Sequence, residues 1–142
     1  MATKVLMIEA RYYDHINDLL LEGARAALDE TGAIYEVVTV PGALEIPAAL
    51  NMAVHGKNKY DAYIVLGCII RGETSHYDIV CNESARGVYD LVTRNHLALG
   101  NGILTVENEE QALARADMRR KNKGGDAARA ALAMLAYKGK VA

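Results

Sequence analysis

The sequence contains no tryptophan and no phenylalanine, only two prolines and two cysteines, and a formal net charge of −2. This small charge provides no basic field for nucleic-acid binding, so any bound anion must be held by local groups. The first apolar run, residues 5–8, is too short for a membrane span or a signal peptide. Cys68 and Cys81 form a single pair without metal-ligand spacing, which indicates reduced thiols in a cytoplasmic protein without a metal site.

The chain does contain enough apolar sequence for one folded domain. Its 142 residues are 51% hydrophobic and 24% charged, and no repeat or low-complexity segment interrupts them. A chain of this length buries roughly two-thirds of its unfolded surface on folding. We therefore expect a single domain over residues 1–142.

Continuous apolar runs alternate with stretches of helical periodicity along the chain. The runs predict parallel strands at residues 4–10, 35–40, 61–66 and 102–106. The periodic stretches predict helices at residues 16–28, 44–54, 78–95, 109–116 and 126–137. With right-handed crossovers, this alternation predicts an α/β three-layer sandwich around a four-stranded parallel sheet ordered 2-1-3-4.

In such a sheet, ligands bind beyond the carboxyl ends of the strands, where the strand order switches. Arg11 and Tyr12 follow the first strand, residues 41–45 follow the second, and residues 67–76 follow the third. The Tyr12 ring can stack on a planar heterocycle. Backbone groups of residues 68–70 can hydrogen-bond the edge of such a ring.

The segment GCIIRGETSHYDIVCNESARG, residues 67–87, is the most informative part of the sequence. It leaves a strand, passes two glycines and a Thr-Ser pair, and enters a helix with His76 in its first turn. A helix N-terminus offers free N–H groups and about half a positive charge to an anion, and histidine exchanges protons near neutral pH. The segment predicts an enzyme site for a small phosphorylated molecule. In the alternative interpretation, Thr74 or Ser75 is only a helix N-cap, with Ser75 and Asp78 forming a capping box.

Two further polar residues lie far from His76 in the expected fold. Asn101 is expected at the start of the fourth strand, and Arg115 at the end of the helix that runs back. Five strand residues span roughly 17 Å, so neither is expected to reach the pocket of its own chain. Both can reach a neighbour's pocket in a head-to-tail ring of subunits. Without such a ring, Arg115 is simply a solvated helix residue.

Five motifs in this order resemble the lumazine synthases, the enzymes of riboflavin biosynthesis that make 6,7-dimethyl-8-ribityllumazine. The motifs are ARYYDHI, VPGALEIP, GCIIRGETSHYDIVCNESARG, GILTVENEEQALARA and NKGGDAA, and the resemblance covers residues 4–137. It implies a flavodoxin-like fold, homopentamers or their multiples, and active sites shared between adjacent subunits. It also implies condensation of 5-amino-6-(D-ribitylamino)uracil with 3,4-dihydroxy-2-butanone 4-phosphate, no cofactor, and a functional link to riboflavin synthase.

The resemblance also assigns roles to individual residues of this chain. His76 takes the position of the proton-transfer residue, and Arg115 that of the neighbour's phosphate clamp. Glu73 and Thr74 match the phosphate-binding turn, where Glu73 is expected to use its backbone N–H and turn its carboxylate outward. The residues that match the aminouracil site are Tyr12, Ala43, Leu44, Glu45, Cys68, Ile69, Ile70 and, from the neighbouring subunit, Asn101.

Two other functions stay open at the level of the sequence. One is a catalytically weak relative that binds flavin or lumazine as a carrier or regulator. The other is a plain phosphate- or nucleotide-binding module, although the sequence lacks GxGxxG and Walker motifs. The residues at positions 74, 76 and 115 favour the enzyme over a carrier or regulator.

Overall fold

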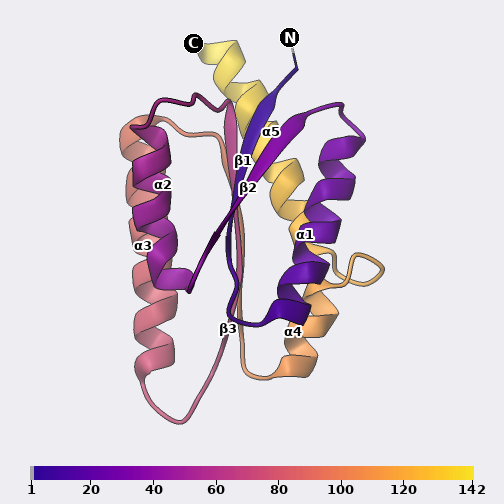
Figure 1. Ribbon diagram of the computed structural model, residues 1–142, viewed down its shortest axis with the longest axis vertical. Helices are drawn as coiled ribbons and strands as arrows, with labels where there is room; N and C mark the ends of the chain where they lie inside the picture. The colour runs from indigo at the N-terminus through magenta and orange to yellow at the C-terminus, as the bar shows by residue number, and fades with distance from the viewer. Residues whose placement is uncertain (1) are drawn as a thin grey trace.

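The computed structural model describes residues 2–142 as a parallel sheet between two layers of helices (Figure 1). The strands are β1 (Lys4–Ala10), β2 (Ile34–Val40), β3 (Ala62–Ile70) and β4 (Leu99–Val106). The helices are α1 (Asp14–Asp29), the 3₁₀ turn η1 (Ala43–Glu45), α2 (Ile46–Val54), α3 (His76–Asn95), α4 (Glu109–Ala116) and α5 (Lys123–Val141). The sheet order is β2-β1-β3-β4 with all pairs parallel, which confirms the predicted flavodoxin-like α/β fold.

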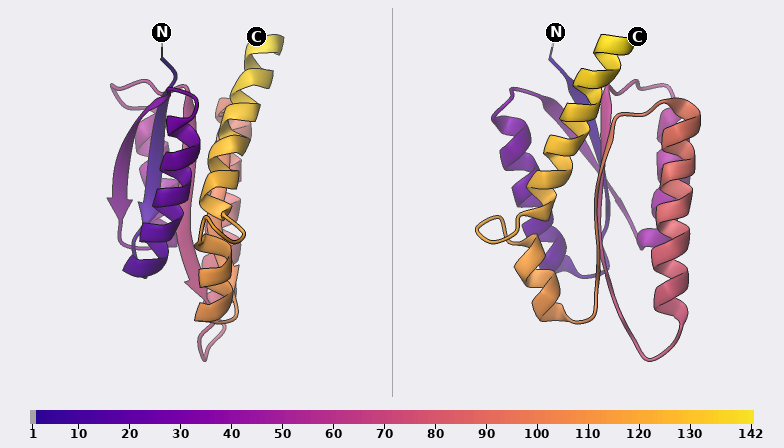
Figure 2. Two further views of the ribbon diagram at one scale, coloured as in Figure 1. Left: turned by 90° about the vertical axis from the view of Figure 1, so that its right-hand side faces the viewer. Right: turned by 180° about the vertical axis from the view of Figure 1, so that it is seen from behind.

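The two helical layers are unequal. Helices α2 and α3 cover one face of the sheet, and α1, α4 and α5 cover the other (Figures 1 and 2). The central strands β1 and β3 are buried on both faces because helices cover both, which explains their continuous apolar sequence. Each face therefore has its own apolar core, one against α1 and α5 and the other against α2 and α3.

Glycines let α5 lie unusually close to its neighbours. A Cβ atom at Gly100 in β4 would overlap the carbonyl oxygen of Ala127 in α5. A Cβ atom at Gly124, in the first turn of α5, would overlap the carbonyl oxygen of Leu20 in α1. These two contacts fix α5 against both the sheet and α1.

Several expected boundaries were wrong by a few residues. Strand β3 does not end at residue 66 but continues to Ile70, and β4 begins at Leu99, three residues before the expected start. The second expected helix is divided into η1 and α2. The last helix begins at Lys123, because Asn122 caps it by accepting a hydrogen bond from the Gly125 N–H at 3.1 Å.

The start of α3 also differs from the capping-box interpretation. The Ser75 side chain makes no capping hydrogen bond, and the bond from the Asp78 N–H goes to the Ser75 carbonyl at 3.0 Å. The Thr74 hydroxyl oxygen instead accepts from the His76 N–H at 3.3 Å. The helix therefore starts two residues earlier than expected, with His76 as its first residue.

Candidate active site

A cavity of about 480 Å³ lies beyond the carboxyl ends of β1, β2 and β3. Figure 1 shows these strand ends at the bottom of the sheet. Its volume falls within the usual range for small-molecule sites. Three chain segments build it: the turn after β1, the turn after β2, and the end of β3 with the first turns of α3. The lining residues are Tyr12, Tyr13, Gly42, Ala43, Leu44, Glu45, Cys68, Ile69, Ile70, Gly72, Thr74, His76, Tyr77 and Val80.

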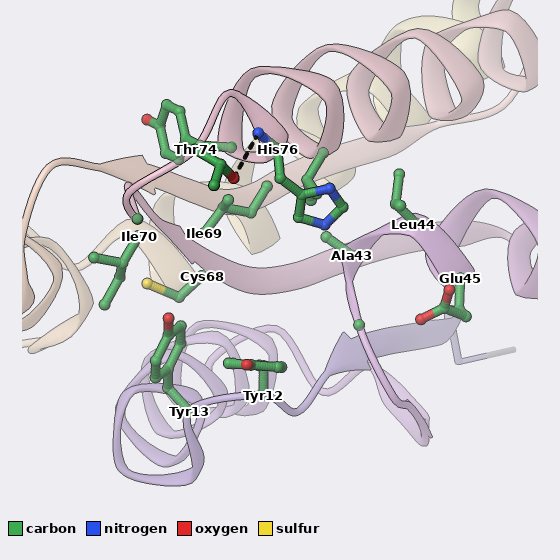
Figure 3. Close-up of a pocket in the computed structure, with 14 residues that line it drawn as sticks. Tyr12, Tyr13, Ala43, Leu44, Glu45, Cys68, Ile69, Ile70, Thr74 and His76 are labelled. Atoms are coloured by element: carbon green, nitrogen blue, oxygen red, sulfur yellow. Dashed lines mark hydrogen bonds between the residues drawn. The ribbon is translucent and has the colours of Figure 1, made fainter.

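Two tyrosines form the wall that follows β1. Tyr12 leaves 72% of its surface exposed, whereas Tyr13 is partly buried against the core. Their rings meet edge to face, with centroids 4.9 Å apart. Burial is the main cause that raises the pKa of Tyr13. Figure 3 shows Tyr13 next to Cys68 and Tyr12 beside Tyr13. Because most of its surface is exposed, Tyr12 presents an accessible aromatic ring to a ligand.

The turn after β2 supplies the second wall. Gly42 is extended and leads into η1, which places Ala43 and Leu44 opposite His76 in Figure 3. The Glu45 carboxylate turns back toward Gly42, where an added Cβ atom would stand 3.1 Å from Glu45 Oε1. A carboxylate in this position can accept hydrogen bonds from hydroxyl groups of a ligand.

The end of β3 forms the floor. The register of β1 with β3 ends at Glu9 opposite Leu66, whereas residues 67–70 of β3 pair with β4 alone. Backbone groups of this stretch that face the β1 side are therefore available to the edge of a ligand ring. Burial raises the pKa of the Cys68 thiol to about 12, so this side chain is neutral and apolar at neutral pH.

Arg71 holds the start of α3 against the end of β4. Its backbone N–H donates to the Val106 carbonyl at 3.0 Å, and its guanidinium donates to Glu107 at 2.9 Å. The same guanidinium lies 3.7 Å from Asp78 and 4.3 Å from the centre of the Tyr77 ring. These contacts fix the turn that carries Thr74 into the cavity.

The cavity therefore combines an aromatic ring, an apolar floor with free backbone edges, an imidazole and a helix N-terminus. Such a set can hold a planar polar heterocycle and an anion side by side, and can move a proton between them. Within residues 2–142, no cluster of three His, Cys, Asp or Glu side chains is placed to hold a metal ion. Over the same residues, no helix is long and apolar enough to cross a bilayer.

The sequence itself decides the family. Residues 2–138 match the family model described as 6,7-dimethyl-8-ribityllumazine synthase. The chain belongs to the 6,7-dimethyl-8-ribityllumazine synthase family. It is accordingly an enzyme of the transferase type.

Several similar proteins have the same name, and each aligns with this chain over nearly its whole length. The 6,7-dimethyl-8-ribityllumazine synthase of Sphingopyxis alaskensis is 63% identical over 134 residues, covering 94% of each chain. That of Zymomonas mobilis is 59% identical over 97% of this chain and 98% of its own. The 6,7-dimethyl-8-ribityllumazine synthase 1 of Rhizobium meliloti is 58% identical over 94% of this chain and 90% of its own.

Most of the residues that the resemblance assigned to the lumazine synthase site come together in this cavity. Those that line it are Tyr12, Ala43, Leu44, Glu45, Cys68, Ile69, Ile70, Thr74 and His76. Glu73 is exposed and does not line the cavity, although Gly72 and Thr74 on either side of it do. This placement is what an outward-turned Glu73 carboxylate requires.

Asn101 and Arg115 do not line the cavity of their own chain. Asn101, expected at the start of a strand over residues 102–106, is the third residue of β4, and its side chain accepts from the Ile103 N–H at 2.8 Å. Arg115 lies on α4, in the helical layer opposite α3, and donates to the Gln111 carbonyl at 3.1 Å. In the single chain, both are therefore separate from His76.

Five lining residues were not among the assigned site residues: Tyr13, Gly42, Gly72, Tyr77 and Val80. Of these, Gly42 and Gly72 lie in the segments 41–45 and 67–76, which were expected at this edge of the sheet. Tyr13 and Tyr77 each follow an assigned residue in sequence, and this adjacency alone could have indicated that they line the cavity. Val80 lies one helical turn after His76, so the period of α3 brings it to the same face.

Proposed function

We propose that this enzyme condenses 5-amino-6-(D-ribitylamino)uracil with 3,4-dihydroxy-2-butanone 4-phosphate to give 6,7-dimethyl-8-ribityllumazine, inorganic phosphate and water. The observation that carries the proposal is the family match over residues 2–138, combined with one cavity that contains nine of the assigned residues. This is the penultimate step of riboflavin formation, so riboflavin synthase would consume the product. A cytoplasmic location is part of the same proposal.

The proposed binding mode uses the two walls of the cavity, its floor and the N-terminus of α3. The uracil ring stacks on Tyr12, and its edge meets backbone groups of residues 68–70. The ribityl chain lies along η1, with Glu45 accepting from its hydroxyl groups. The phosphate of the second substrate lies at the N-terminus of α3, beside Thr74 and the backbone of Glu73.

In the proposed chemistry, the proton transfers of imine formation need more catalysis than the departure of phosphate, which is already a good leaving group. The 5-amino group attacks the ketone, one water leaves as the imine forms, and phosphate then leaves by elimination. Ring closure by the ribityl-bearing nitrogen releases a second water. His76 transfers protons during these steps, while holding the two substrates together supplies an effective concentration on the order of 10⁵ M.

We also propose that each site is completed by the adjacent subunit of a homopentamer. Support comes from Arg115 and Asn101, which lie outside the cavity of their own chain although the family resemblance assigns both to the site. An arginine suits this role because its planar guanidinium can pair with two phosphate oxygens. A fully active monomer, identified by light scattering at assay concentration, would contradict this arrangement.

The direct test mixes the purified protein with both substrates. We expect a fluorescent bicyclic product and release of inorganic phosphate in equal amounts, with neither formed when one substrate is omitted. Tight binding of lumazine or riboflavin without product formation would refute the proposal and identify a carrier or regulator.

A further inference from the structure

A buried carboxylate lies near the carboxyl end of β1, in a strand whose other buried residues are apolar. Glu9, in β1, is only 3% exposed, and it is not among the residues that line the cavity. A buried charge is costly unless it is paired and hydrogen-bonded. The partners of Glu9 therefore indicate what this residue does.

The first partner is Arg11, which begins the turn that carries Tyr12. Its guanidinium meets both oxygens of Glu9, with Nε to Oε2 at 3.1 Å and Nη2 to Oε1 at 3.0 Å. The third nitrogen, Nη1, donates to Asp18 at 2.8 Å and to the Asp14 carbonyl at 3.2 Å. Since Tyr13 makes no side-chain capping bond, Arg11 is the group that ties the start of α1 to β1.

The second partner is Thr39, near the end of β2. Its hydroxyl donates to Glu9 Oε2 at 2.7 Å. One residue further along, the Val40 carbonyl accepts from the Arg11 N–H at 3.0 Å. The chain then continues into Gly42 and Ala43, so Glu9 is joined to both walls of the cavity.

The surroundings of Glu9 favour the ionised form of its carboxylate. Burial alone raises the pKa of Glu9, but the hydrogen bonds from Arg11 and Thr39 outweigh it and the net direction is downward. Asn17, which is fully buried in α1, also donates to Glu9 Oε1 at 3.5 Å. The carboxylate is thus ionised and can accept several hydrogen bonds at once.

We propose that Glu9 is a positioning residue: it sets the spacing between the Tyr12 turn and the η1 turn, and thereby the width of the slot for the planar substrate. It touches no substrate itself. The proposal rests on the proposed function for the identity of that substrate, and it predicts a selective loss of affinity for the pyrimidine over the phosphorylated ketone.

The variant that tests this is Glu9→Gln, which keeps the side-chain size and removes the charge. Thr39→Val, a milder variant, removes only the link to β2. The matched control is Glu36→Gln, because Glu36 accepts from Tyr60 at 2.7 Å and pairs with Lys4 near the opposite end of the sheet. All three are compared by steady-state kinetics with each substrate varied in turn, and by the fluorescence anisotropy of bound lumazine.

We expect Glu9→Gln to raise the KM for the pyrimidine and the dissociation constant for lumazine about tenfold, the scale of one charged hydrogen bond. Thr39→Val should raise both about threefold, and Glu36→Gln neither. The KM for the ketone phosphate should change less than about twofold in every variant, because its site is built by α3. Unchanged pyrimidine affinity in Thr39→Val and in folded Glu9→Gln would overturn the proposal, and so would equal losses for both substrates.

A crystal structure of Glu9→Gln separates this proposal from the proposed function. We expect the Tyr12 turn to be displaced relative to η1, with α3 and the cavity floor unmoved. An unchanged Tyr12 turn refutes the positioning role even if the wild-type enzyme makes lumazine. A wild-type protein that makes no lumazine refutes the proposed function, whereas a displaced turn would still support the positioning role.

Discussion

Replacing His76 with alanine removes the imidazole from the cavity and leaves its two walls and its floor in place. The hydrogen bond that His76 makes is from its backbone N–H to Thr74, and within residues 2–142 no carboxylate pairs with its ring. An imidazole that no carboxylate orients is expected to accelerate the reaction by about 10²-fold, the lower end of the range for general acid–base catalysis. This corresponds to about 2.7 kcal/mol of transition-state stabilisation.

The assay is the initial rate of lumazine formation at saturating concentrations of both substrates. We expect kcat of His76→Ala to fall about 10²-fold, because positioning of the two substrates persists. His55→Ala is the matched control, since His55 follows α2 outside the cavity and its Nδ1 contacts the Asn51 carbonyl. Complete inactivation of folded His76→Ala would show that the imidazole does more than assist proton transfer, and an unchanged rate would show that it does less.

Three other predictions follow from burial and packing. The pKa of the Cys68 thiol is about 12, so a fraction of about 10⁻⁴ of it should be ionised at pH 8. Mass spectrometry should therefore find Cys68 unalkylated by iodoacetamide until the protein is denatured. Rapid labelling of the native protein would contradict this. Gly100→Ala should lower the free energy of unfolding by about 3 kcal/mol in urea titrations, because the new methyl group overlaps the Ala127 carbonyl. Gly139→Ala has open space around it and should raise the free energy of unfolding by about 0.5–1 kcal/mol. Equal effects of the two substitutions would refute the close packing at Gly100. Because the pKa of Glu9 is lowered in the folded state, its contribution to stability is complete above the unfolded-state value of about 4.3 and disappears as the pH falls through the folded-state value. The stability difference between wild type and Glu9→Gln should therefore be constant from about pH 5 to 7 and shrink below about pH 4, and a constant difference down to pH 2 would contradict it.

The sheet and its order were predictable because they depend on the simplest signals in the sequence. The apolar runs and the helical periods alternate clearly, and the right-handed crossover rule leaves few topologies. Two strand boundaries were wrong at glycines that have a packing role. Gly67 was placed just after the end of β3, but it lies within the strand, where an added Cβ atom would stand 3.3 Å from the Ala10 Cβ. Gly100 likewise belongs to β4, beneath α5.

The cavity was predictable only in part, for a related reason. Strand ends and the family motifs indicated residues such as Tyr12 and His76, because their positions in sequence correspond to the carboxyl edge of the sheet. The role of Glu9 was not predictable, because one acidic residue in an apolar run does not reveal its partners. Its link to Thr39 joins residues 30 positions apart in sequence, and only the folded chain brings them together.

The shared site is tested most directly by mixing two damaged variants. Arg115→Ala should raise the KM for the ketone phosphate, and His76→Ala should lower kcat. The two variants are refolded together in equal amounts and assayed at a ketone phosphate concentration well below the KM of Arg115→Ala. Activity should rise toward about a quarter of wild type, because about a quarter of the sites then combine a cavity that has His76 with a neighbouring subunit that has Arg115. Activity equal to the average of the two separate variants would show that Arg115 does not act in a neighbour's site.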